Sequence, residues 1–150
     1  WDLWRFRLPD CREVHIWLSC VPQDFRAWDG LDLGLMRSEG RILVRYQALL
    51  VGHVADRAGF GEIGGHRVPV VNCPNDLRSE VGHELLARYP EEPFVAMWSV
   101  DRNGFQGWSL RSRGEFDVSE LAATLGGGGH PASSGFRRPP GRWILAPLGR

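Results

Sequence analysis

The chain has 150 residues, no net charge and 43% hydrophobic residues, the composition of a globular protein with one core. A balanced charge argues against a general binder of polyanions. No stretch approaches the ~20 apolar residues that span a bilayer, and no secretory signal is recognisable, so we expect no membrane partner. Three cysteines without a CxxC pair are typical of free thiols, and they predict a cytoplasmic protein.

The first third of the sequence predicts helices. Asp10 is placed to cap a helix over residues 11–20, and residues 23–28 favour a further turn. Residues 35–58 predict a long amphipathic helix, because apolar side chains recur at spacings near three and four. The residues of this stripe are Leu35, Ile42, Tyr46, Leu49, Leu50 and Val54.

The middle of the chain predicts a break, a strand and a helix. Residues 59–65 are glycine-rich and read as the break, with a hairpin turn at Gly64 and Gly65. Residues 66–72 alternate and are β-branched, which is typical of a strand. Asn75 or Asp76 is then expected to cap a helix that runs to about residue 89.

The last third predicts an antiparallel pair of strands and a short helix. Residues 94–100 and 105–113 read as strands around an Asn-Gly turn, and Asp117 with Glu120 forms a capping box for a helix to residue 125. We expect a helical turn over 131–135.

A final strand is expected from Phe136, resuming over 143–146. Strands interspersed with helices predict an α/β fold, a mixed sheet flanked by helices and preceded by the long helix.

The glycine run at 126–129, followed by His130, predicts an anion site. Glycine lets backbone N–H groups approach an anion without a Cβ in the way, and a helical turn at Pro131 would add its positive end. Arg111 and Arg113 precede the run on one side of a strand, and a guanidinium matches phosphate oxygens. The last 50 residues hold seven arginines against four carboxylates, which suits anion capture.

The candidate substrate-binding residues are therefore Arg111, Ser112, Arg113, Gly127, Gly128, Gly129 and His130. Ser112 points to the opposite face if the strand stays extended. Secondary candidates are Asn72, Ser79 and His83. No catalytic residue and no metal ligand is assigned to this chain.

Four motifs resemble the DHH-associated domain, the C-terminal substrate-binding domain of DHH-type phosphoesterases. They are SLRSRG at 109–114, FDVSELA at 116–122, GGGGH at 126–130 and GF at 135–136. The resemblance extends to residues 71–86 and 2–9, so it covers nearly the whole chain. Ser133 and Ser134 depart from it, because the family usually has two alanines there. Their hydroxyls are expected to change polar contacts in the pocket.

The resemblance implies two parts, a helical connector over 1–60 and the substrate-binding domain over 61–150. The family's Asp-His-His triplet is absent from the sequence, so the catalytic domain is expected to lie outside it, N-terminal to residue 1. The implied Mn²⁺ or Mg²⁺ would be bound by that missing domain, with no cofactor on this chain. The implied partners are that domain and a nucleotide or short single-stranded nucleic acid, and a homodimer is compatible with the sequence.

The implied function is phosphate binding within a phosphodiesterase that hydrolyses short oligonucleotides or cyclic dinucleotides. A stand-alone nucleotide-binding or RNA-binding module without catalysis is the alternative. The C-terminal domain of alanyl-tRNA synthetases also carries a glycine-rich loop, but SLRSRG together with GGGGH favours the phosphoesterase type. The sequence leaves the identity of the phosphoester, the exonuclease polarity and the oligomeric state open.

Overall fold

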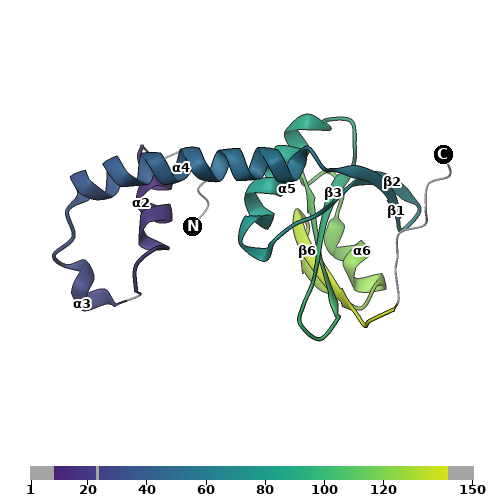
Figure 1. Cartoon of the computed structure of the whole chain (residues 1–150). Helices are drawn as coiled ribbons and strands as arrows, with labels where there is room; N and C mark the ends of the chain where they lie inside the picture. The colour runs from purple at the N-terminus through teal and green to yellow at the C-terminus, as the bar shows by residue number, and fades with distance from the viewer. Residues whose placement is uncertain (1–8, 23, 142–150) are drawn as a thin grey trace. The chain divides into compact units, whose positions relative to one another are not determined.

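The computed structural model describes residues 9–22 and 24–141 (Figure 1). The chain divides into two compact units, residues 1–50 and 51–150. The first unit contains the helices α2 (Cys11–Leu18) and α3 (Phe25–Trp28) and most of α4 (Leu33–Ala55). Within the described residues, no helix is long and apolar enough to cross a membrane.

Helix starts in the first unit differ from the predicted ones. Asp10 precedes α2, but its backbone is left-handed and its side chain makes no capping hydrogen bond, so that prediction was wrong. Its carboxylate instead pairs with Arg37 at 3.1 Å. Helix α4 begins two residues earlier than expected, because Asp32 Oδ1 accepts a hydrogen bond from the Gly34 N–H at 2.7 Å.

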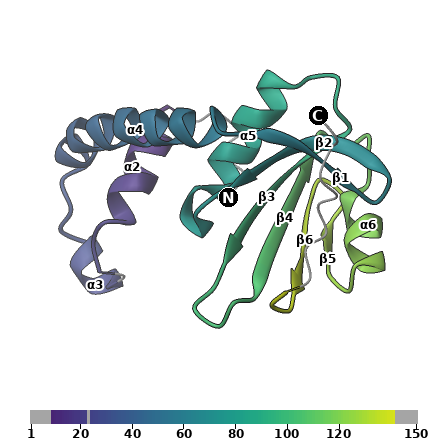
Figure 2. The same cartoon turned by 45° about the vertical axis from the view of Figure 1, so that its right-hand side comes forward.

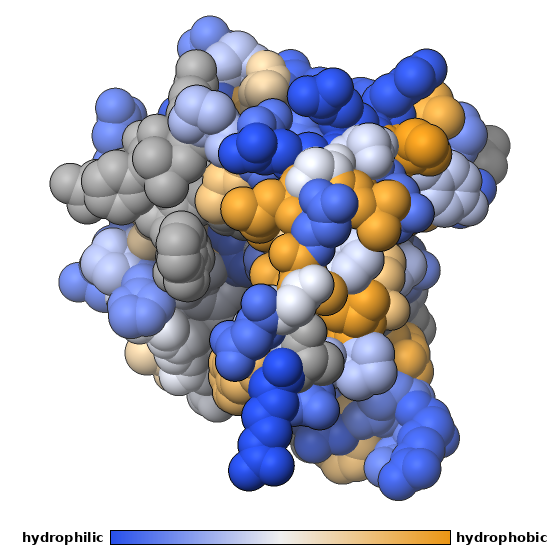
Figure 3. Space-filling view, turned by 90° about the vertical axis from the view of Figure 1, so that its left-hand side faces the viewer, coloured by the Kyte–Doolittle hydropathy of each residue, from blue (hydrophilic) through white to orange (hydrophobic). Residues whose placement is uncertain are grey.

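The apolar stripe of α4 lies largely on the surface. Figure 3 shows apolar side chains gathered in a patch on the face that it draws. The spacing predicted the helix correctly, yet Ile42 is 68% exposed, while Met36 is buried. The exposed large apolar residues of α4 are Leu33, Leu35, Ile42, Tyr46 and Leu49. Gly40 permits close packing, since a Cβ there would lie 2.4 Å from the Glu13 carbonyl oxygen.

The second unit is built on a six-stranded sheet of order β1-β2-β3-β4-β6-β5 (Figure 2). Only the β2–β3 pair is parallel among these neighbours, so the sheet is mixed, as the sequence predicted. The strands are β1 (Gly59–Ile63), β2 (His66–Asn72), β3 (Phe94–Val100), β4 (Gln106–Ser112), β5 (Gly128–His130) and β6 (Ser133–Arg138).

Helices cover both faces of this sheet. Helix α5 (Arg78–Arg88) packs with the end of α4 on one face, which contains Val95 and Met97. We call this the α5 face. Helix α6 (Val118–Thr124) packs on the other, the α6 face, against Leu110 and Phe136. The two apolar layers confirm the α/β class, with a long helix before the sheet.

Two predicted non-strand segments form strands. The expected break contains β1, which pairs with β2 through a hairpin at Gly64 and Gly65, both at positive φ. The expected helical turn at 131–135 was wrong, because β6 begins at Ser133 and pairs with β5. Both β1 and β5 contain two glycines, so cross-strand pairing rather than propensity determines them.

Of the two helix caps predicted in the second unit, the one for α5 is wrong and the one for α6 is confirmed. Neither Asn75 nor Asp76 caps α5, which follows a short 3₁₀ turn (Asn75–Leu77) without a side-chain cap. Asp117 caps α6 as predicted, and its Oδ1 accepts from the Ser119 N–H at 2.8 Å. The strand expected over 143–146 and residues 2–8 of the matching segment 2–9 lie outside the described residues.

Candidate functional site

Arg111 and His130 lie in one row of the sheet. Arg111 on β4 pairs with Ser133 on β6, which pairs with His130 on β5. Directly paired residues of antiparallel strands share a face. Because Arg111 also pairs with Val95, a core residue under α5, the row lies on the α5 face. Strand spacing puts its two ends about 10 Å apart.

A second row runs beside the first. Ser109 pairs with Gly135, and Gly135 pairs with Gly128. A Cβ at Gly128 would meet nothing within 4 Å, so this end of the row is open. The two rows together form a strip of hydroxyl, guanidinium and imidazole groups beside bare backbone, which we call the α5-face strip. It consists of Ser109, Arg111, Gly128, His130, Ser133 and Gly135.

The backbone conformation or a close neighbour requires glycine at three of the four positions of the run, but not at Gly128. Gly126 has a φ of 80°. A Cβ at Gly127 would lie 2.1 Å from the Gly135 carbonyl oxygen, and one at Gly129 would lie 2.6 Å from Ser134 Cα. Gly128 has neither a positive φ nor a close neighbour. Its lack of a side chain therefore leaves space that a ligand can occupy.

Arg78 is a member of the site that the sequence interpretation missed. It opens α5, and its guanidinium donates to the Ser109 hydroxyl at 3.0 Å, the Ser99 hydroxyl at 2.7 Å and the Gly107 carbonyl at 2.9 Å. A Cβ at Gly107 would lie only 3.3 Å from that guanidinium. A cation in the first turn of a helix opposes the helix dipole, and this was the available sequence signal.

The charges of Arg78 and Arg111 are uncompensated. Burial, and then the nearby Arg78 charge, lower the pKa of Arg111, and burial also lowers the pKa of Arg78. Neither makes an ion pair with a carboxylate of the described residues. Arg78 Nε is buried without a hydrogen-bond partner there. A bound anion would supply the missing counter-charge and reduce the repulsion between the two guanidinium groups.

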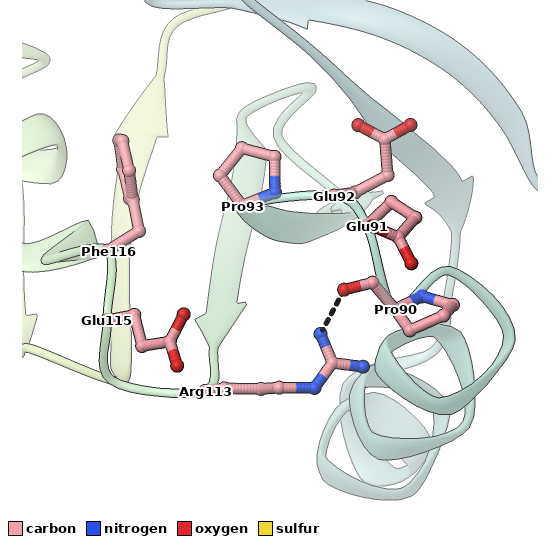
Figure 4. Close-up of a pocket in the computed structure, with 7 residues that line it drawn as sticks. All are labelled: Pro90, Glu91, Glu92, Pro93, Arg113, Glu115 and Phe116. Atoms are coloured by element: carbon pink, nitrogen blue, oxygen red, sulfur yellow. Dashed lines mark hydrogen bonds between the residues drawn. The ribbon is translucent and has the colours of Figure 1, made fainter.

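Four predicted site residues lie outside this strip: Gly127 and Gly129, which pack against β6, and the side chains of Ser112 and Arg113. Ser112 is buried on the α6 face, where its hydroxyl donates to the Pro131 carbonyl at 3.3 Å. Arg113 follows β4 and donates to the Pro90 carbonyl at 3.3 Å. Figure 4 shows it at the wall of a pocket of about 220 Å³. Three acidic residues, Glu91, Glu92 and Glu115, also line that pocket.

The side chains of Asn72 and His83, two of the secondary candidates, contact backbone carbonyls. Asn72 Nδ2 donates to the Trp98 carbonyl at 3.1 Å, and His83 Nδ1 lies 2.9 Å from the Ser79 carbonyl oxygen.

The two serines that depart from the resembled family have separate surroundings. Ser134 is buried and donates to the Val118 carbonyl at 2.6 Å, so it faces α6. Ser133 lies between Arg111 and His130 in their row. Of the two hydroxyls, only that of Ser133 belongs to the α5-face strip.

No group of three or more His, Cys, Asp or Glu side chains that could hold a metal ion occurs in the described part of the chain.

No protein-family model matches the chain. Over 144 residues it is 25% identical to the uncharacterized protein R106 of Acanthamoeba polyphaga mimivirus, covering 90% of this chain and 34% of that protein. The structure of the pGpG-specific phosphodiesterase PggH from Vibrio cholerae has a TM-score of 0.48 and 16% identity, covering 67% of this chain and 36% of that chain. The chain thus spans about a third of the length of each, and neither match establishes an activity.

Proposed function

We propose that the second unit binds the phosphate group of a nucleotide or short single-stranded nucleic acid. In this proposal it is the substrate-binding domain of a DHH-type phosphodiesterase that acts on short oligonucleotides or cyclic dinucleotides. The observation that carries the proposal is the pair Arg78 and Arg111. They are neighbouring, partly desolvated cations without a carboxylate partner among the described residues.

The α5-face strip offers the contacts that such a ligand needs. Arg111 supplies a charged fork at one end of a row, and His130 supplies a ring nitrogen about 10 Å away. The open backbone at Gly128 lies beside them. Each charge-assisted hydrogen bond contributes about 1.5–3 kcal/mol, and several together fix the ligand's orientation.

The motif resemblance supports the same assignment, since Arg111 and His130 occupy its SLRSRG and GGGGH segments. The implied Mn²⁺ or Mg²⁺ does not fit the described residues, because they gather no suitable ligand group. We therefore assign no bond-breaking step to this chain. Its proposed contribution is to bind and orient the phosphoester.

Titration of the full chain with a 5′-phosphorylated dinucleotide in metal-free buffer, followed by calorimetry, tests the proposal. Arg111→Gln and His130→Gln are each expected to weaken binding about tenfold or more, because each removes a charge-assisted or directed hydrogen bond. Arg113→Gln is the matched control, since it removes the same charge two residues away, where the side chain contacts Pro90.

Binding that is absent in the folded wild type, or equal in wild type and both site variants, would overturn the proposal. A loss in Arg113→Gln as large as that in Arg111→Gln would instead indicate general charge attraction rather than a site.

A further inference from the structure

The hydrogen bonds of Arg78 determine what two serine hydroxyls can do. Both Ser99 and Ser109 accept a hydrogen bond from the guanidinium, so each hydroxyl has its own proton left to donate. Ser99 donates to Asn75 Oδ1 at 3.2 Å. Among the described residues, the Ser109 hydroxyl donates no hydrogen bond. Arg78 thus makes Ser109 a hydrogen-bond donor that has no acceptor among the residues that the structure describes.

Ser109 lies in the row of paired residues that ends at Gly128, which has no side chain. Its neighbours across the strands are Met97 on one side and Gly135 and then Gly128 on the other, so no side chain of that row covers it on the side of β6 and β5. An acceptor that enters the open space at Gly128 lies on the same face as the Ser109 hydroxyl. The unused donor is therefore placed for a ligand on the α5-face strip.

Arg78 also sets the charge of the site. With Arg111 it brings two positive charges to one region, and their mutual repulsion contributes to the lowered pKa of Arg111. A terminal phosphate monoester carries about −1.5 to −2 charges at pH 7, because its second pKa lies near 6. An internal phosphodiester carries one. The charge of the monoester can therefore neutralise both guanidinium groups, whereas the charge of the diester can neutralise one.

We propose that Arg78 is a positioning residue of this site, which holds the Ser109 hydroxyl as a donor to the ligand and, with Arg111, selects a doubly charged terminal phosphate over an internal diester. This inference rests on the proposed function, and it adds a residue and a selectivity to it.

The test compares two ligands on the full chain by calorimetry, a 5′-phosphorylated dinucleotide and the same dinucleotide without the terminal phosphate. The wild type is expected to prefer the phosphorylated ligand by roughly tenfold or more at about pH 7.5, and by less at about pH 5, where the phosphate takes up a proton. Arg78→Gln is expected to lose most of the preference at about pH 7.5 and its pH dependence.

Two further variants separate charge from position. Arg78→Lys keeps the charge but not the planar fork, so the preference should persist while both ligands bind more weakly. Ser109→Ala keeps both arginines, so it should weaken the phosphorylated ligand without removing the pH dependence. Arg67→Gln is the matched control, because Arg67 is exposed and paired with Glu92. It should leave the ratio of the two affinities unchanged.

Other titrating groups near the site do not produce this pattern. His130 lies at the other end of its row, about 10 Å from Arg111. Burial raises the pKa of the Cys73 thiol, which acts electrostatically on Arg78, to about 11, so this thiol stays neutral throughout.

An Arg78→Gln protein that folds and keeps the wild-type ratio overturns this inference alone. If Arg78→Gln does not fold, loss of the preference in Arg78→Lys, or no effect of Ser109→Ala, overturns it instead. A folded wild type that binds neither ligand overturns the proposed function and this inference with it.

Discussion

Gly82 of α5 packs directly against the side chain of Arg111. A Cβ at Gly82 would lie 2.8 Å from Arg111 Cγ and 3.1 Å from Met97 Cε. The helix thus packs on the aliphatic stem of the arginine, whose Nη1 donates to the Leu110 carbonyl at 2.9 Å. Because Cγ lies near the backbone of Arg111, it cannot move away as freely as the tip of the side chain.

Gly82→Ala is therefore expected to displace Arg111 and to weaken binding of a 5′-phosphorylated dinucleotide severalfold. Its effect on the free energy of unfolding should be small, because alanine gains up to about 1 kcal/mol of helix propensity, which offsets the crowding. Calorimetry and urea unfolding measure the two quantities.

Gly52→Ala in α4 is the control, since a Cβ there meets nothing within 4 Å. It should stabilise the protein and leave binding unchanged. Equal binding by Gly82→Ala and wild type would contradict the role assigned to this contact.

The glycine run offers a test that separates structure from ligand binding. Gly127→Ala is expected to destabilise the protein by more than about 2 kcal/mol, because its Cβ would overlap the Gly135 carbonyl oxygen. Gly128→Ala should cost little stability and reduce affinity, because its methyl group enters the open space of the strip. Thermal unfolding and ligand titration of both variants distinguish the two effects, and unchanged affinity in Gly128→Ala would place the ligand elsewhere.

The two serines after the run are expected to respond in opposite ways to alanine. Ser134→Ala should lower the free energy of unfolding by about 1 kcal/mol, because it removes a buried hydrogen bond to the Val118 carbonyl, and it should not change affinity. Ser133→Ala should leave stability nearly unchanged and weaken binding, because Ser133 lies between Arg111 and His130. A stability loss in Ser133→Ala as large as in Ser134→Ala would contradict their placement on opposite faces.

Local patterns predicted the elements whose signals lie within the element itself. Strand β3 has a continuous apolar run, and α6 has Asp117 as its cap. Strands β1 and β5 escaped prediction because glycines carry no strand signal, and each depends on pairing with a neighbour. Arg78 escaped because its partners Ser99 and Ser109 are 21 and 31 residues away in sequence. Only the register of β3 and β4 brings these hydroxyls to the start of α5.

The cap of α6 makes a specific contribution to the pH dependence of stability. A hydrogen bond from the Ser119 hydroxyl, followed by backbone N–H bonds, lowers the pKa of Asp117 below its ordinary value of 3.8. A carboxylate whose pKa is lower in the folded state stabilises the fold above the pKa of the unfolded state. That stabilisation is lost as the pH falls through the folded value.

Asp117→Asn removes this dependence, because asparagine caps a helix without a titrating charge. The difference in free energy of unfolding between wild type and variant should be largest above about pH 5 and should decrease as the pH falls through the lowered pKa of Asp117. Urea unfolding at a series of pH values measures it. Asp76→Asn is the charge-matched control, since Asp76 caps no helix. A pKa that differs between the folded and unfolded states requires a stability difference that changes with pH. If the difference in free energy of unfolding between wild type and Asp117→Asn is constant between pH 3 and pH 7, the carboxylate charge adds nothing to the cap.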